Sequence, residues 1–136
     1  MAVVGGMLAL QAPINAGLAK ATGTFPAALI SFAVGTAALL AVVVISGKAG
    51  GVGEASTVHW YYLLGGLLGA AYVFTALVIV GEIGAGGVAA ATISSQLTAS
   101  VLIDRLGVFG LEETPITPER LAGVALLFAG TYLVVR

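Results

Sequence analysis

The chain has 136 residues, of which 60% are hydrophobic and only 8% are charged. A water-soluble domain carries roughly 25% charged residues, so this composition excludes an ordinary soluble globule and indicates a protein whose solvent is largely lipid. Five basic residues against six acidic ones leave almost no net charge, so we do not expect nucleic acid as a partner. The sequence has no cysteine, which excludes disulfide bonds and thiolate metal sites.

Five apolar segments come close to the about 20 residues that a helix needs to cross the hydrocarbon core of a bilayer. We expect transmembrane helices over residues 2–19, 26–46, 60–80, 85–103 and 119–135. The first segment lacks the basic start of a signal peptide and contains Gln11, Pro13 and Asn15. We therefore interpret it as a retained helix.

The links between these segments are short and carry ordinary boundary signals. Pro26 suits the first turn of a helix, and residues 47–58 form a Gly-rich polar loop. The aromatic run 59–62 suits the headgroup level, and residues 82–84 mark a tight connection. Residues 117–119 read Thr-Pro-Glu, an N-cap followed by a first-turn proline and acid. We expect an all-α, polytopic membrane protein whose residues 1–136 form one transmembrane domain.

The basic residues are distributed almost evenly between the two sides of this predicted bundle. After five crossings, the side of the first residue receives Lys48, Arg105 and Arg120, and the other side receives Lys20 and Arg136. Orientation normally follows a clear excess of Lys and Arg on the cytoplasmic side, and here the excess is one residue. Two interpretations stay open: a weakly oriented protein, or one that inserts both ways and pairs as an antiparallel homodimer.

Polar side chains at membrane depth are the first candidates for a site. Gln11 and Asn15 are one helical turn apart on the same face of the first segment. Pro13 between them removes a backbone hydrogen bond and frees the carbonyl of Ala9, which would be costly against lipid. The face therefore lines a substrate path or pore, or belongs to a kinked helix whose amides bond to neighbouring helices.

The fourth segment holds the second concentration of polar residues. Thr92 and Gln96 recur at a spacing of four, Ser95 lies beside them, and Gln96 needs a hydrogen-bonding partner at mid-depth. Tyr72, near the centre of the third segment, needs a partner for its phenol or packs in the core. Ser31 and Thr36 in the second segment are weaker candidates.

The middle of each segment contains no Asp, Glu, Lys or Arg; Glu82 and Asp104 are the nearest acids, and both lie at predicted helix ends. A buried carboxylate is the common device for proton coupling or cation capture. The implied site is therefore neutral and suits a small polar or zwitterionic solute. No catalytic dyad, metal-ligand cluster or phosphate-binding loop occurs at a plausible spacing, so we expect neither an enzyme nor a cofactor.

With these positions in place, the chain resembles the YdcZ-like family of the drug/metabolite transporter superfamily. The resemblance rests on Gln11-Ala12-Pro13-Ile14-Asn15-Ala16, on Ser31-Phe32 with Gly35, on Gln96, and on Asp104 with Gly107 and Gly110. It implies a multi-pass inner-membrane exporter with a five-helix layout, and it favours an antiparallel homodimer. It supplies no substrate.

The leading hypothesis is a small transporter or facilitator of a polar solute, embedded in the lipid bilayer. The predicted substrate-binding residues are Gln11, Asn15, Gln96, Ser95, Thr92 and Tyr72, and Pro13 is the predicted helix kink. Two alternatives remain: a channel-like pore for a small ion or neutral solute, and a non-transporting membrane assembly partner.

Overall fold

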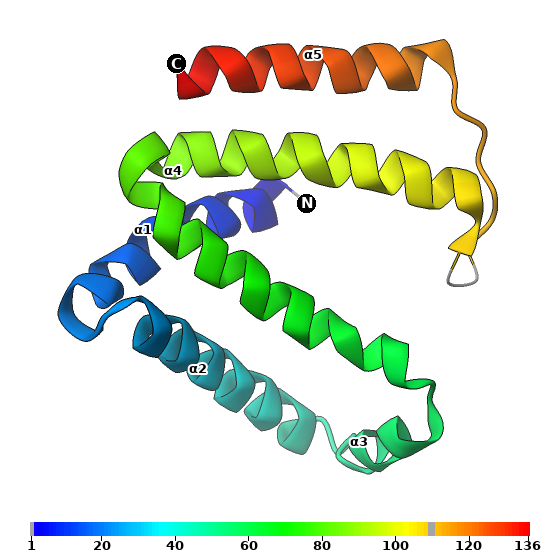
Figure 1. Ribbon diagram of the computed structural model, residues 1–136. Coiled ribbons are helices and arrows are strands. Elements are labelled where there is room, and N and C mark those ends of the chain that lie inside the picture. Colours follow the sequence, from blue (N-terminus) through cyan, green and yellow to red (C-terminus); the bar gives the residue numbers. More distant parts are fainter. Residues whose placement is uncertain (1, 109–110) are drawn as a thin grey trace. The chain divides into compact units, whose positions relative to one another are not determined.

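The computed structural model describes residues 2–108 and 111–136, and this part of the chain is helical, without a β-strand (Figure 1). Its elements are α1 (Ala2–Thr22), α2 (Thr24–Ile45), α3 (Gly50–Gly53), the 3₁₀ turns η1 (Glu54–Thr57) and η2 (Trp60–Leu63), α4 (Leu64–Leu106) and α5 (Pro118–Val135). The prediction of an all-α membrane protein is confirmed. The short elements α3 and η1 occupy the loop expected at 47–58.

Three segments of the described chain are long and apolar enough to cross a membrane: Thr24–Ile45, Trp60–Leu106 and Pro118–Val135. Helix α4 alone has 43 residues, which would extend about 65 Å if straight, about twice the thickness of the hydrocarbon core. Helix α1 has 21 residues and a length of about 31 Å, which also matches the thickness of the hydrocarbon core. The count of five crossings stays a prediction.

Helix α4 joins the two segments that were expected separately at 60–80 and 85–103. Two helical segments meet there in a kink at Gly84, which leaves helical geometry with φ 71° and ψ 169°. A residue with a Cβ atom is strained in this conformation, whereas glycine adopts it readily. This kink lies within the tight connection expected at residues 82–84.

The chain divides into two compact units, Met1–Leu10 with Ile79–Arg136, and Gln11–Val78. The single domain expected for residues 1–136 stays a prediction. In the unit Gln11–Val78, the core is a cluster of Ala27, Val73 and Leu77, surrounded by Ala16, Leu18, Ala19, Ala28 and Tyr72. The rings of Phe25 and Phe74 stack with their centroids 4.7 Å apart. These contacts pack α2 against the first half of α4.

In the other unit, α5 lies beside the second half of α4, and buried hydroxyl groups join the two helices (Figure 1). Ser94 on α4 is 1% exposed, and its Oγ lies 2.6 Å from Oγ1 of Thr131 on α5. At one end of the pair, Arg120 and Asp104 form an ion pair of 3.4 Å. The side chain of Thr117 caps α5 by accepting from the backbone N–H of Arg120.

Most large apolar side chains of the described residues are exposed. Ile45 is 86% exposed, Val3 78% and Leu126 74%, whereas only a few small or branched hydrophobic residues are buried. A soluble monomer rarely exposes such continuous apolar surface, because water penalises it. The exposure is the pattern expected of helices in contact with lipid or with a further helix.

Candidate solute-binding site

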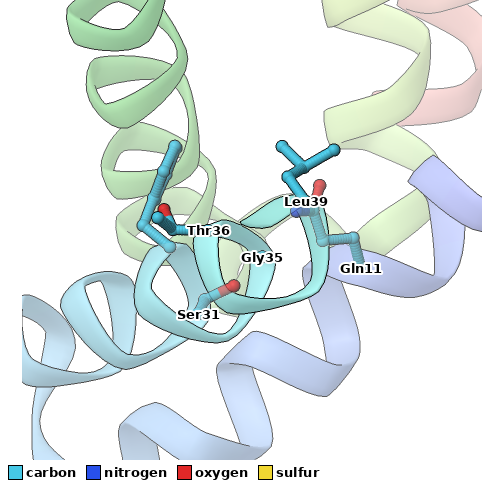
Figure 2. A pocket seen from close by; sticks show the side chains of 6 residues that line it. Gln11, Ser31, Gly35, Thr36 and Leu39 are labelled. Atoms are coloured by element: carbon cyan, nitrogen blue, oxygen red, sulfur yellow. The ribbon is translucent and has the colours of Figure 1, made fainter. Parts of the chain in front are cut away.

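A small cavity opens between α1 and α2 within the unit Gln11–Val78 (Figure 2). Its volume is about 200 Å³, and it is lined by Gln11, Ser31, Phe32, Gly35, Thr36 and Leu39. Figure 2 shows Gln11 on α1 and the other labelled residues on successive turns of α2. The cavity is the meeting point of one amide, two hydroxyls and two large apolar side chains.

Helical spacing explains why these α2 residues share one face. Ser31, Gly35 and Leu39 follow one another at intervals of four, so they form one row along the helix. Phe32 and Thr36 form the adjacent row. Glycine at the centre of the first row leaves space between the side chains above and below it, and this space is the floor of the cavity.

The cavity lies at mid-length of both helices. Gln11 is the tenth of the 21 residues of α1, and Gly35 is the twelfth of the 22 residues of α2. The unpaired backbone N–H and C=O groups at the helix termini carry partial charges that act only over the first and last turns. They are therefore remote from this position. In a helix that spans the bilayer, mid-length corresponds to the middle of the hydrocarbon core.

The chemistry of the lining is polar but uncharged. The amide of Gln11 can donate and accept hydrogen bonds, as can the hydroxyls of Ser31 and Thr36. Among the residues that the structure describes, the side chain of Gln11 makes no hydrogen bond. A half-buried amide with free donors and acceptors therefore faces the cavity.

The other predicted residues of this unit occupy different positions. Asn15 is buried, with 6% of its surface exposed, but it is not among the residues that line the cavity. Tyr72 is half-buried and packs against the cluster of Ala27, Val73 and Leu77. Pro13 lies inside α1 and is exposed. Their roles in binding stay predictions.

The predicted residues of the second half of α4 belong to the other unit, and none of them lines the cavity. Gln96 is exposed, and Thr92 is half-buried. The hydroxyl of Ser95 donates to carbonyls of its own helix, 2.9 Å to Ala91 and 3.0 Å to Thr92. That hydroxyl is satisfied locally, whereas the amide of Gln96 has no hydrogen-bonding partner among the described residues.

Sequence reasoning underestimated Ser31 and Thr36, which contribute two of the three polar groups of the cavity. Each hydroxyl alone carries little information, because Ser and Thr can bond back to their own helix. A usable signal was their position on two adjacent rows around Gly35, at the same helical depth as Gln11 on the preceding segment. The spacing places them on one face, but only the packing of α1 on α2 brings Gln11 to it.

Comparison with known proteins identifies the family. No curated protein and no solved structure matched the chain. Residues 1–133 match the family described as "Putative inner membrane exporter, YdcZ". The match covers nearly the whole chain and agrees with the apolar, membrane-length helices. The chain therefore belongs to the YdcZ family of inner-membrane exporters.

Proposed function

We propose that this inner-membrane protein transports a small polar solute through the cavity between α1 and α2, and that it works as an antiparallel dimer. The observation that carries the proposal is the mid-helix position of a cavity lined by Gln11, Ser31 and Thr36. Hydrocarbon offers no hydrogen bonds, so an unpaired amide at this depth is costly unless a polar solute, water or another protein group contacts it.

The remaining predicted residues extend this proposal. Asn15 follows Gln11 by one turn, and Gln96 is a second amide without a hydrogen-bonding partner among the described residues. We also assign Thr92, Ser95 and Tyr72 to solute binding as further polar groups. Pro13 lacks the backbone donor that would complete the helical hydrogen bond, so α1 bends there at low cost.

An antiparallel dimer supplies the symmetry that such a carrier needs. Many transporters contain two repeats of inverted topology and alternate by rocking one repeat against the other around a mid-membrane site. Two oppositely inserted copies of one chain give the same arrangement. The support is the near-even distribution of basic residues, three on one predicted side and two on the other.

Topology is tested by fusing reporters after Arg136 that report either a cytoplasmic or a periplasmic C-terminus. Dual insertion predicts that both kinds of reporter are active in the same cells. Activity of one kind alone contradicts the antiparallel homodimer. It leaves a parallel dimer or a second gene product as the partner.

Transport is tested with purified protein in liposomes, by following the flux of amino acids, small amines, polyols and small anions. Gln11→Ala and Gln96→Ala should abolish saturable flux and leave dimer assembly intact. The matched control is Ser46→Ala at the end of α2, because its hydroxyl only donates to the carbonyl of Val43 at 3.0 Å. Loss of folding in the Gln11 variant instead assigns this amide a structural role.

The alternatives give different results in the same experiment. A channel-like pore gives flux that does not saturate with solute concentration and does not respond to proton or sodium gradients. A membrane assembly partner gives no flux above that of empty liposomes and copurifies with another protein. Saturable, Gln11-dependent flux excludes both.

A further inference from the structure

The lining of the cavity contains no group that can balance a charge on a solute. Its six lining residues are Gln, Ser, Phe, Gly, Thr and Leu, and none of them is ionisable. The helix termini, whose partial charges could serve instead, are remote because the cavity lies at mid-length of α1 and α2. An ion in this position would gain no counter-charge from the lining residues to offset the hydration that it gives up on binding, which is unfavourable.

The cavity is also small. A volume of about 200 Å³ corresponds to about six or seven water molecules, each of which occupies about 30 Å³ in the liquid. Sites for drug-sized ligands are larger, at about 300–1,000 Å³. The polar groups lie beside the ring of Phe32 and the side chain of Leu39. A solute that fits can make hydrogen bonds and apolar contacts at the same time.

Gly35 is the lining residue without a side chain. It is the middle residue of the row Ser31–Gly35–Leu39, where a side chain would project between its neighbours. A Cβ atom added to Gly35 would meet no atom within 4 Å. A methyl group at this position therefore occupies part of the space without displacing the protein around it.

We propose that the cavity accepts a small, uncharged, hydrogen-bonding solute of about polyol size, and that Gly35 sets the upper size limit. This inference rests on the transport function proposed above and specifies its substrate class. Gln11, Ser31 and Thr36 supply the hydrogen bonds, and the absence of an ionisable group among the lining residues means that no proton is exchanged within the cavity.

The charge requirement is tested with three solutes that share a three-carbon skeleton: glycerol, glycerate and 3-amino-1,2-propanediol. Flux into liposomes that contain the wild-type protein is compared with flux into empty liposomes. We expect facilitated flux for glycerol and none for the anion or the cation. Faster flux of either charged solute than of glycerol overturns the substrate class but leaves a transporter. No facilitated flux of any solute, including the wider panel above, overturns the transport function as well.

The size limit is tested with glycerol, erythritol and xylitol in the variants Gly35→Ala and Gly35→Leu. The added methyl of Gly35→Ala should reduce flux of the largest transported polyol about tenfold, which corresponds to about 1.4 kcal/mol of steric cost, and should reduce glycerol flux by a smaller factor. Gly35→Leu should stop flux of all three. The matched controls are Gly130→Ala and Gly130→Leu on α5, because a Cβ at Gly130 also meets no atom within 4 Å.

Helix content and dimer formation are measured for every variant, so that a folding defect is recognised. If the Gly35 variants stay folded and keep the wild-type preference among the three polyols, Gly35 does not set the limit. If they lose dimer assembly while the Gly130 variants keep it, the cavity is a packing surface for a second copy, and the assignment as a solute site is wrong. A shift of the size preference confined to the Gly35 variants supports the proposal.

Discussion

Removing the hydroxyl of Ser94 measures how strongly α5 is held against α4. Ser94 is 1% exposed, and its Oγ lies 2.6 Å from Oγ1 of Thr131 and 3.2 Å from the carbonyl oxygen of Leu127. It also lies 3.0 Å from the carbonyl oxygen of Ala90 in its own helix. Each hydroxyl has one proton, so these acceptors share the two protons of Ser94 and Thr131.

The expected loss for Ser94→Ala is about 1 kcal/mol of unfolding free energy. Hydrogen bonds between helices in a membrane contribute about 0.6 kcal/mol on average and about 1.7 kcal/mol at most. The substitution leaves no buried donor unpaired, because Thr131 still donates to the carbonyl oxygen of Ala90 at 3.0 Å. We therefore expect no additional loss of unfolding free energy from an unpaired buried donor.

The neighbouring Ser95 is a matched control. Its hydroxyl is exposed and donates only to carbonyls of its own helix, those of Ala91 and Thr92. Ser95→Ala removes the same atom at the next position without removing a bond to α5. We expect it to change the unfolding free energy by a few tenths of a kcal/mol at most.

The assay is reversible unfolding in mixed micelles for Ser94→Ala, Thr131→Val and the double variant. The coupling energy from this double-mutant cycle should be about 0.6–1.7 kcal/mol, because the two hydroxyls contact each other directly. A coupling energy indistinguishable from zero would falsify the assignment of this contact as a hydrogen bond that joins the helices. A loss for Ser95→Ala as large as that for Ser94→Ala would have the same consequence.

Three further substitutions test the turns and helix ends by the same unfolding measurement. Gly84→Ala should destabilise the protein by about 1–3 kcal/mol, because φ 71° and ψ 169° strain a residue with a Cβ; Gly81→Ala, inside the regular helix, should not. Thr117→Ala should remove about 0.5–2 kcal/mol through loss of the N-cap of α5. Asp104→Asn should remove less than about 1 kcal/mol, and less at high salt, because the pair with Arg120 is more than one-third exposed. An insensitive Gly84 or a large, salt-independent effect at Asp104 contradicts this reasoning.

Composition and periodicity determined the class of the protein. A chain with 60% hydrophobic and 8% charged residues cannot cover a soluble surface, and its apolar segments have the length of a bilayer. The sequence also predicted the N-cap at Thr117 and the break near residue 84, because helix capping and the backbone geometry of glycine depend on only a few neighbouring residues. The helix α5 begins at Pro118, next to the expected start.

Local signals located this break but did not determine its backbone angles. The sequence suggested a tight connection between two helices, and in the structure two helical segments meet in a kink at Gly84 within the range labelled α4. Glycine adopts helical and positive φ angles at similar cost, so its presence alone does not determine which of them forms.

The candidate site also depends partly on local sequence and partly on tertiary packing. Gln11 was recognisable alone, because an amide halfway along an apolar helix needs an explanation. Ser31 and Thr36 were not, since hydroxyls are cheap in a membrane helix and their spacing only places them on adjacent rows of one helix face. The packing of α1 on α2 brings that face to Gln11, and the missing side chain of Gly35 turns the contact into a cavity. The sequence by itself determined where polar groups occur, and the tertiary structure decided which of them meet, because contact between helices depends on packing across distant segments.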